Sequence, residues 1–305
     1  MKHKFCPDEI IFSVTNKCNL KCPHCYVEQK NLSLDIEKAK FLIKNSLNAK
    51  PETEWRIGFT GGEPFLNLDF LCQISKFCVE NNIMFDRIMT NALWWETEDD
   101  LQTSLTRLYE SGYDGKIGIS LDSFHGGDFR KTAKFIFYVT KIWQNPMMCE
   151  IQATYSTIKT SLHTLKKQKN IIKLLLLELE RLECDAQVRV DFNKQVFSSD
   201  SPLAWKDKKW FREDFCVPTG NIFYVHTNGS IAPCCGYSNE NEKLIIGTVD
   251  DDYETLLNNV QKNRIAKICF ETGLENWRKT ESKCKRKLPG KTSSPCTLCD
   301  FVCRL

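Results

Sequence analysis

The sequence predicts an α/β fold, either an open partial barrel or a doubly wound sheet, followed by a small C-terminal α+β unit. Strand-like and helix-like segments alternate from the start to about residue 195, which is typical of βαβ units and a parallel sheet. Six strands with five intervening helices fall short of the eight repeats of a closed barrel. Near the C-terminus a hairpin signal, one helix and a cysteine-rich end replace this alternation.

The alternating part contains short apolar runs of strand type and longer runs with helical periodicity. The predicted strands are Glu9–Val14, Glu54–Thr60, Phe85–Asn91, Lys116–Asp122, Glu150–Ser156 and Gln187–Asn193. The predicted helices are Leu34–Asn48, Leu68–Asn81, Glu98–Ser111, Asp128–Trp143 and Lys167–Leu182.

The C-terminal part has a different pattern. The stretch "GNIFYVHTNGSIAPCC" alternates around "NGS", which predicts a hairpin. Residues 250–270 predict one helix that begins with acidic residues. The end, "SSPCTLCDFVCRL", is too short for a core, so we expect a metal to stabilise this unit. The predicted domains are residues 1–205 and 206–305.

The charge pattern names no charged partner. Lys and Arg number 42 and Asp and Glu 39, with both signs interspersed, so no basic face predicts nucleic-acid binding. The start has no apolar stretch long enough for a signal peptide, and the most apolar segment, 171–182, is interrupted by Lys and Glu. We expect a cytoplasmic protein with no membrane partner.

Sixteen cysteines are unusual for a chain from a reducing compartment. There, clustered cysteines more often bind metal or perform redox chemistry, whereas scattered ones are small core residues. Four isolated cysteines in apolar patterns are predicted to be packing residues: Cys72, Cys78, Cys149 and Cys184.

One cluster has the spacing C-x3-C-x2-C and follows the first predicted strand. Cys18, Cys22 and Cys25 are therefore expected in a loop at the C-terminal end of that strand, where sites form in such folds. A structural zinc site normally takes four protein ligands, whereas three thiolates on a cluster leave one metal position open. His24 is the local candidate for a fourth ligand, but it lies between two ligands and is expected to point away.

A second cluster lies in the C-terminal part. The predicted hairpin would bring Cys216 and Cys234 to one end, and Cys296 and Cys299 form a C-x2-C pair. Four cysteines in this arrangement predict a metal site, and the spacing fits zinc as well as an iron–sulfur cluster.

The first cluster, followed by the aromatic Tyr26, resembles the signature of the radical SAM superfamily. The stretch "TGGEPFLN" after the second predicted strand matches the superfamily's GGE loop at Gly61, Gly62 and Glu63. The resemblance implies a (β/α)6 partial barrel. It also implies that the three cysteines hold a [4Fe-4S] cluster whose fourth iron is chelated by S-adenosylmethionine (SAM), which is cleaved reductively to a 5′-deoxyadenosyl radical. Glycines permit close approach of the backbone, and the Glu63 carboxylate would accept from the SAM ammonium group.

The same resemblance suggests further SAM contacts after the third and fourth strands. Thr90, Asn91, Ser120, Asp122 and His125 are expected at one rim, with Asn91, Ser120 and Asp122 as cofactor-binding candidates. The alternative for each is a satisfied loop or cap residue. His125 would serve the substrate or bond to the backbone.

The C-terminal cysteines resemble a twitch domain, a shortened SPASM domain. This implies one auxiliary [4Fe-4S] cluster on Cys216, Cys234, Cys296 and Cys299. A second auxiliary cluster is expected only if Cys269, Cys284 and Cys303 combine.

Cys235 directly follows one of these ligands. Adjacent residues on a strand point in opposite directions, so if Cys234 faces the auxiliary cluster, Cys235 is expected to face elsewhere, toward the mouth of the barrel. A thiol there could return a hydrogen atom to a substrate radical, as in radical SAM epimerases, which this design resembles. The alternatives are a buried small residue or another ligand.

Three functions remain open. The first is a radical SAM enzyme that modifies a ribosomally made peptide, by epimerisation with Cys235 as hydrogen donor or by crosslinking. The second is a dehydrogenase or epimerase of a small polar molecule such as an aminocyclitol or sugar. The third is a zinc-stabilised binding protein. The first two functions imply flavodoxin or ferredoxin as the electron donor.

Overall fold

The computed structural model describes residues 5–156, 161–212, 215–283 and 288–305. The chain forms two compact units. The core unit comprises Phe12–Ile36 and Arg56–Gln195, and the C-terminal unit comprises Met1–Ile11, Glu37–Trp55 and Val196–Leu305.

The sheet of the core unit is parallel, and its strands follow one another in chain order. The strands are β2 (Arg56–Thr60), β3 (Met84–Thr90), β4 (Lys116–Ser120), β5 (Cys149–Tyr155) and β6 (Arg189–Lys194). The end of β1 (Glu9–Ser13) lies beside β2, and the Val14 amide donates to Thr60 O at 2.8 Å.

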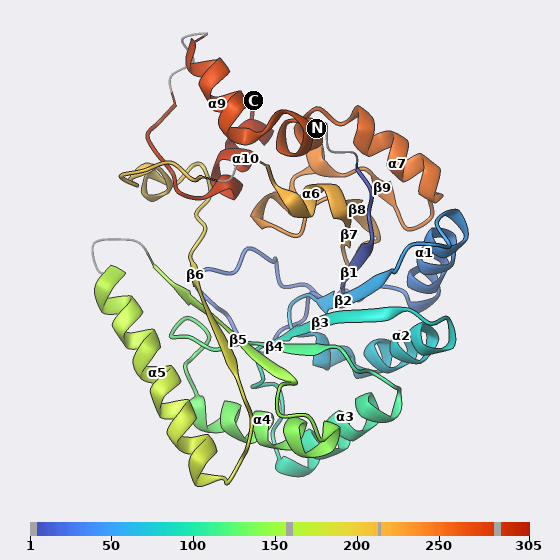
Figure 1. Cartoon of the computed structure of the whole chain (residues 1–305), viewed down its shortest axis with the longest axis vertical. Coiled ribbons are helices and arrows are strands. Elements are labelled where there is room, and N and C mark those ends of the chain that lie inside the picture. The colour runs from blue at the N-terminus through green and yellow to red at the C-terminus, as the bar shows by residue number, and fades with distance from the viewer. Residues whose placement is uncertain (1–4, 157–160, 213–214, 284–287) are drawn as a thin grey trace. The chain divides into compact units, whose positions relative to one another are not determined.

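One helix lies in each crossover between these strands: α2 (Leu68–Glu80), α3 (Glu98–Glu110), α4 (Phe129–Trp143) and α5 (Ser161–Arg181). They line the outer side of the strands in Figure 1. Right-handed crossovers between consecutive strands keep the helices on one side, whereas a doubly wound sheet reverses its strand order and carries helices on both faces. The predicted α/β fold class is thus confirmed, as the open partial barrel.

Aromatic packing and a capped helix illustrate how the sequence builds this unit. Phe70 of α2 meets Phe12 and Phe59, with ring centroids 6.0 and 6.4 Å away, and all three side chains are fully buried. Helix α3 begins with a capping box, in which Thr97 Oγ1 accepts from the Asp100 amide and Asp100 Oδ2 accepts from the Thr97 amide. Such local signals explain why most element bounds agree with the prediction within about two residues. Helix α5 is an exception, since it begins at Ser161 rather than at Lys167.

The C-terminal unit is built around an antiparallel hairpin. Strands β7 (Ile222–Val225) and β8 (Ser230–Ala232) pair as predicted, and β9 (Gly247–Thr248) adds to β8. Gly229 adopts a φ of +85° in the turn, which suits glycine. Short helices α6 (Val217–Asn221), α8 (Arg264–Lys267), α9 (Leu274–Lys283) and α10 (Pro295–Cys303) complete the unit with α1 (Ile36–Ala49) and α7 (Tyr253–Lys262).

The N-terminal segments belong to this unit because they contact its C-terminal part. The Asp8 amide donates to Asn221 O at 2.9 Å, and Lys38 Nζ lies 2.7 Å from Asp250 Oδ2. Asn45 Nδ2 donates to Asp251 O at 3.2 Å. The C-terminal unit therefore includes two N-terminal segments, and its main part begins at Val196. The domain boundary at 205/206 stays a prediction.

The single helix predicted over 250–270 is wrong. Helix α7 ends at Lys262, and Asn263 is extended with φ −69° and ψ 116°. Its side chain accepts from the amides of Ile265 and Ala266, so it begins α8 instead of continuing α7. Asparagine offers the backbone such local bonds, and helical periodicity alone does not reveal this competition. A π-helical turn, Ile268–Thr272, follows.

The terminal helix α10 contributes to a core, contrary to the expectation that this segment is too short for one. Leu298 and Val302 pack in one cluster with Trp205, Leu274 and Trp277. The segment is short, but it joins apolar residues supplied by other elements of the same unit. Apolar burial therefore stabilises this unit independently of any metal.

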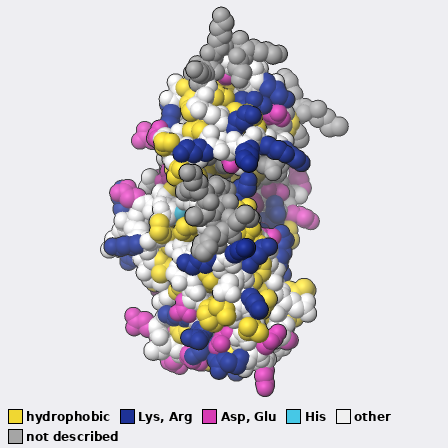
Figure 2. All heavy atoms as spheres, turned by 90° about the vertical axis from the view of Figure 1, so that its left-hand side faces the viewer, with side chains coloured by type: hydrophobic (Ala, Val, Ile, Leu, Met, Phe, Trp, Pro, Cys, Tyr) yellow, Lys and Arg dark blue, Asp and Glu magenta, His cyan; other side chains and the backbone are white. Residues whose placement is uncertain are grey.

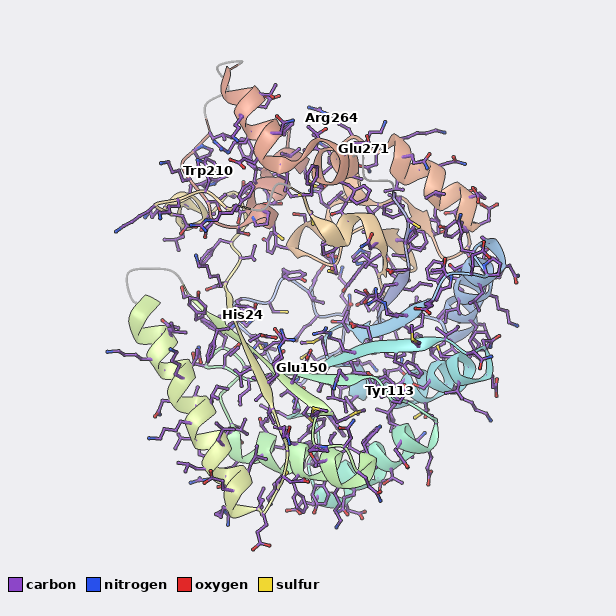
Figure 3. All side chains as sticks on the ribbon, viewed as in Figure 1. His24, Tyr113, Glu150, Trp210, Arg264 and Glu271 are labelled. Carbon is purple, nitrogen blue, oxygen red and sulfur yellow. The ribbon has the colours of Figure 1, made fainter. Side chains whose placement is uncertain are left out.

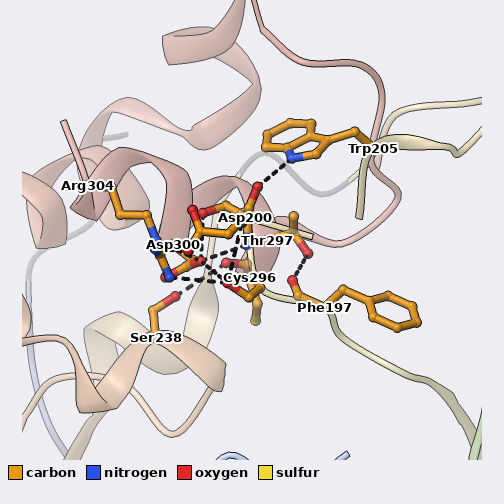
Figure 4. A network of polar contacts seen from close by, with 10 residues as sticks. Phe197, Asp200, Trp205, Ser238, Cys296, Thr297, Asp300 and Arg304 are labelled. Atoms are coloured by element: carbon orange, nitrogen blue, oxygen red, sulfur yellow. Dashed lines mark hydrogen bonds and ion pairs between the residues drawn. The ribbon is translucent and has the colours of Figure 1, made fainter. Parts of the chain in front are cut away.

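A buried carboxylate fixes α10 against residues 197–199 (Figure 4). Asp300 Oδ2 accepts from the Ser199 amide and hydroxyl at 2.8 and 2.7 Å, and Arg304 Nε lies 3.3 Å from the same oxygen. Thr297 Oγ1 donates to Phe197 O at 2.9 Å. These bonds hold the helix that carries Cys296 and Cys299.

The surface carries both signs of charge. Figure 2 shows Lys and Arg side chains interspersed with Asp, Glu and apolar groups on the face it presents. In the described part of the chain, no helix is both long and apolar enough to cross a membrane.

Candidate functional site

The loop that carries Cys18, Cys22 and Cys25 follows β1 and is closed at its base. Thr15 Oγ1 donates to Leu32 O at 2.8 Å and accepts from the Lys17 amide at 3.2 Å. Ser33 Oγ donates to the same hydroxyl at 3.0 Å, and Thr15 is fully buried. The loop is thereby fixed at both ends, which positions the thiols between them.

Backbone amides of this loop turn toward its own cysteines. The Leu20 amide donates to Cys18 Sγ at 3.4 Å, and the Cys25 amide donates to Cys22 O at 3.1 Å. Burial raises the pKa of the Cys18 thiol, and the nearby groups Glu63, Cys22 and Cys25 raise it further. Because a cationic metal displaces the thiol proton, the grouping suits a metal centre better than a free thiolate.

Asn91 follows β3 and reaches the cysteine loop. Its Nδ2 donates to Asn19 Oδ1 at 2.8 Å and lies 3.8 Å from Cys18 Sγ. Its amide donates to Glu63 Oε2 at 2.8 Å. Asn91 therefore joins the GGE loop to the cysteine loop, which gives it a positioning role whether or not it also contacts SAM.

Glu63 is fully buried and holds the ends of two strands together. Its Oε1 accepts from Thr90 Oγ1 at 2.8 Å and from the Phe65 amide at 3.2 Å, while its Oε2 accepts from the Asn91 amide. Burial raises the pKa of Glu63 to about 7, against the opposing effect of these three hydrogen bonds. The bond from this carboxylate to the SAM ammonium stays a prediction, and the structure adds an internal bracing role.

The raised pKa of Glu63 predicts a pH-dependent stability. The folded state keeps its proton up to about pH 7, whereas the unfolded state loses it near 4.5, so stability falls as the pH rises through this window. Between pH 6 and pH 8 the loss is about 1.4 kcal/mol. Thermal unfolding of wild type and Glu63→Gln at both pH values should show the wild-type advantage shrinking by this amount. A constant difference between the two proteins would contradict the assignment.

The two glycines before Glu63 are needed because the cysteine loop lies directly against them. The Gly62 amide donates to Thr15 O at 2.6 Å, and the Glu63 amide donates to Lys17 O at 2.8 Å. A Cβ on Gly61 would lie 2.5 Å from Thr15 O, and one on Gly62 would lie 2.2 Å from Lys17 O. The close approach expected of these glycines is thus made to the loop bearing Cys18.

Asp122 and His125 form a second polar link to the cysteine loop. Asp122 is fully buried; its Oδ1 lies 2.9 Å from His125 Nδ1, and its Oδ2 accepts from the Thr154 amide at 2.8 Å. Burial lowers the pKa of His125, but hydrogen bonds to Asp122 and Cys22 outweigh it and raise the pKa to about 9. Asp122 thus orients His125. The predicted contact of Asp122 with SAM stays a prediction.

The remaining predicted residues of the core unit lie at the same strand ends. Ser120 ends β4 opposite Gln152 and is partly exposed, and Tyr26 is 42% exposed beside Cys25. The ring of His24, which is labelled in Figure 3, has its centroid 5.0 Å from that of Phe124 and 4.8 Å from that of His125. His24 Nδ1 is buried without a hydrogen-bond partner among the described residues, so the expectation that His24 is no ligand stays a prediction.

The C-terminal unit has a pocket lined largely by thiols. Cys216, Cys234, Cys296 and Cys299 are brought together as predicted, and Cys269 joins them. Thr219, Ser238, Leu244, Leu274 and Pro295 complete the lining. Cys216 caps α6, Cys234 follows β8, and the C-x2-C pair lies in the first turns of α10.

A short segment after Cys234 turns polar hydrogens to these sulfurs. The Gly236 amide donates to Cys234 Sγ at 3.2 Å, and the Tyr237 backbone bonds to Cys296. The Ser238 hydroxyl donates to Cys296 O at 3.3 Å. A Cβ on Gly236 would lie 3.1 Å from Cys296 Sγ. Hydrogen bonds to sulfur are the means by which proteins tune iron–sulfur clusters, so the donor set fits such a group.

Among the described residues, no three or more His, Cys, Asp or Glu side chains are arranged to hold a single metal ion. A [4Fe-4S] cluster needs a different arrangement, since each thiolate binds a separate iron and the ligands surround a larger group. Thiols from four separate elements lining one pocket match that requirement.

Cys235 differs from Cys234 in its surroundings, but the reason given for it is wrong. Strand β8 ends at Ala232, so strand alternation does not determine where Cys235 points. Cys234 is 6% exposed and lines the pocket, whereas Cys235 is partly exposed and is absent from the described lining. Its role as hydrogen donor stays a prediction.

The other cysteines fall into two groups. Cys78 and Cys149 are buried as packing residues, while Cys72 and Cys184 are partly exposed. Cys284 lies outside the described residues. None of the described cysteines forms a disulfide.

Three contributors were missed from the sequence. Asn19, within the cysteine loop, accepts from Asn91, and His125 bonds to Cys22. Cys269, which the sequence suggested only for a second cluster, lines the same pocket as the four predicted ligands. The position of Asn19 between two ligands was a usable signal. Cys269 has no local spacing partner, so only the fold reveals its place.

Comparisons with known proteins agree with the site in the core unit. Residues 12–134 match the profile of the Radical SAM superfamily. An uncharacterized protein of Methanocaldococcus jannaschii is 34% identical over 139 residues, covering 44% of this chain and 43% of that protein. A GTP 3′,8-cyclase of Listeria monocytogenes is 32% identical over 128 residues, covering 40% and 36%. The chain thus spans about two fifths of the length of these relatives.

Two solved structures share the fold. The structure of anSMEcpe with AdoMet and a Cp18Cys peptide has a TM-score of 0.59 at 17% identity, with 88% of each chain covered. Streptococcus suis SuiB bound to S-adenosylmethionine has a TM-score of 0.53 at 16% identity, covering 96% of this chain and 77% of SuiB. The cysteine loop, the GGE loop and the strand ends around them all lie within residues 12–134, the part of the chain that is similar to the Radical SAM superfamily.

Proposed function

We propose that this protein cleaves SAM reductively to a 5′-deoxyadenosyl radical and uses it to remove a hydrogen atom from a ribosomally made peptide. The observation that carries this proposal is the bracing of the three-cysteine loop. The backbone of Gly62 and Glu63 bonds to its base, and Asn91 and His125 reach Cys18 and Cys22.

A [4Fe-4S] cluster on Cys18, Cys22 and Cys25 would supply chemistry that amino-acid side chains lack. It would offer one open iron to bind SAM and one electron to cleave it. The residues do the positioning. Glu63 fixes the end of β3 at Asn91, which donates toward Cys18, and Asp122 holds His125 toward Cys22. Hydrogen bonds to ligating thiolates stabilise their negative charge, so this arrangement favours bound over protonated thiols.

The C-terminal pocket would hold an auxiliary [4Fe-4S] cluster on Cys216, Cys234, Cys296 and Cys299. Its support is the thiol lining and the backbone donors of Gly236 and Tyr237. Such a cluster would be a twitch-type electron carrier.

The class of substrate rests on resemblance rather than on a described pocket. The anSMEcpe structure contains a peptide, whereas the relatives at 28–32% identity include GTP 3′,8-cyclases. The matches to these cyclases cover 44% and 40% of this chain. Reaction with a small polar molecule remains the second candidate.

The proposal is tested with SAM and dithionite under anaerobic conditions. Purified protein should contain iron and labile sulfide and should release 5′-deoxyadenosine, measured by liquid chromatography. Two zinc ions with no labile sulfide would instead support the zinc-stabilised binding protein.

Cys235→Ala separates SAM cleavage from hydrogen return. With peptides encoded near the gene as substrates, we expect the variant to form 5′-deoxyadenosine but no epimerised product. In D2O the wild type should place deuterium on the epimerised carbon, because the thiol hydrogen exchanges with solvent. Cys184→Ala, a partly exposed cysteine of the core unit, is the control and should behave as wild type. Unchanged product formation by Cys235→Ala would refute hydrogen donation.

A further inference from the structure

The C-terminal pocket contains one thiol more than a four-iron cluster needs. Cys269 lines it together with the four predicted ligands and is 2% exposed. Its sulfur lies 3.5 Å from that of Cys299, which is 6% exposed. All five thiols belong to the same compact unit.

The position of Cys269 is fixed by its backbone. It lies in the π-helical turn Ile268–Thr272, and its carbonyl accepts from the Cys216 amide at 2.9 Å. The ring of the next residue, Phe270, occupies the space beside Gly220, where a Cβ would lie 1.8 Å from the ring. π-Helical turns are frequent at functional sites, and this one turns a buried thiol toward the other ligands.

The distance of 3.5 Å between the sulfurs of Cys269 and Cys299 limits how these two thiols can bind a cluster. Two sulfurs in van der Waals contact occupy one corner of the pocket. Ligands on two different irons of a cluster lie further apart, because each thiolate is bound on the outer side of its own iron. Cys269 and Cys299 therefore cannot each bind a different iron in this arrangement, but either sulfur can reach the same one.

We propose that Cys269 and Cys299 are interchangeable ligands of one iron of the auxiliary cluster. One thiolate binds the iron, and the other remains a thiol that donates its hydrogen to the bound sulfur. The inference rests on the auxiliary cluster of the proposed function, and it adds a fifth ligand to that site.

The test measures iron and labile sulfide in full-length protein purified anaerobically, with electron paramagnetic resonance (EPR) to identify cluster type. Serine replaces each thiol with little change in volume. We expect Cys269→Ser and Cys299→Ser each to keep the iron content of wild type. The double variant should lose about four iron atoms per chain, one [4Fe-4S] cluster, while the cluster on the core unit remains.

Two further variants make the outcome specific. Cys216→Ser, at a predicted ligand outside the Cys269–Cys299 pair, should by itself lose the auxiliary iron or convert the cluster to a three-iron form. Cys303→Ser is the matched control, because Cys303 bonds to Cys299 but is absent from the described lining. It should keep all the iron, both alone and combined with Cys269→Ser.

The possible failures are distinguishable. If Cys216→Ser changes nothing, the auxiliary cluster itself is absent, and the proposed function loses that part together with this inference. If Cys216→Ser loses iron but Cys299→Ser also loses it or shows a three-iron EPR signal, the exchange of ligands is overturned and the cluster stands. Full iron in the double variant would show that neither thiol is a ligand.

Discussion

Cys18→Ala is expected to abolish formation of 5′-deoxyadenosine. Removal of one of three thiolates leaves two ligands for the cluster, so the open iron that would bind SAM is no longer held. Iron content should fall by about four atoms per chain, with the auxiliary cluster retained. The measurements are anaerobic turnover with SAM and dithionite and iron analysis of the same sample.

Cys78→Ala is the control for this experiment. Cys78 is fully buried in α2, among packing residues and outside the cysteine loop. The variant should lose some stability through the small cavity but keep iron and SAM cleavage. Continued cleavage by Cys18→Ala would remove the basis for the three-cysteine site.

Gly62→Ala is expected to have the largest effect among substitutions outside the cysteines. Its Cβ would lie 2.2 Å from Lys17 O, and the obstacle is backbone that cannot rotate away. The loop must move, which breaks the bond from the Glu63 amide to Lys17 O. We expect a loss of about 3 kcal/mol of stability, the upper range for overpacking, with a reduced iron content.

A matched glycine distinguishes this clash from a general effect of alanine. Gly126 has a φ of +87°, but a Cβ there has nothing within 4 Å. Gly126→Ala should therefore cost only about 1 kcal/mol of backbone strain and keep the iron. Thermal unfolding and iron analysis of both variants provide the comparison, and equal behaviour of the two would contradict the packing argument.

The alternation of apolar runs was sufficient to predict the strands of the core unit. Buried parallel strands appear as apolar runs, and helices such as α3 carry their own caps, so these signals are local. The order of the strands and the side on which the helices lie were decided by packing. The pattern of strands and helices alone left a partial barrel and a doubly wound sheet open, the resemblance to the radical SAM superfamily implied the partial barrel, and the strand order of the structure confirmed it.

The prediction failed where one residue's local bonds compete with a regular pattern. Asn263 interrupts a helix that periodicity supports over 250–270, because its side chain caps α8. Similarly, β8 ends two residues before Cys234, so the alternation of side-chain directions along a strand does not apply to Cys234 and Cys235.

The sequence by itself determined the ligand spacing of both sites, since C-x3-C-x2-C and C-x2-C place thiols within one loop or one helical turn. The tertiary structure alone decided which distant groups meet those thiols. Asn91 reaches Cys18 across 73 positions of the chain, and Cys269 reaches Cys299 across 30. Such contacts depend on how strands and turns pack, so no local pattern encodes them.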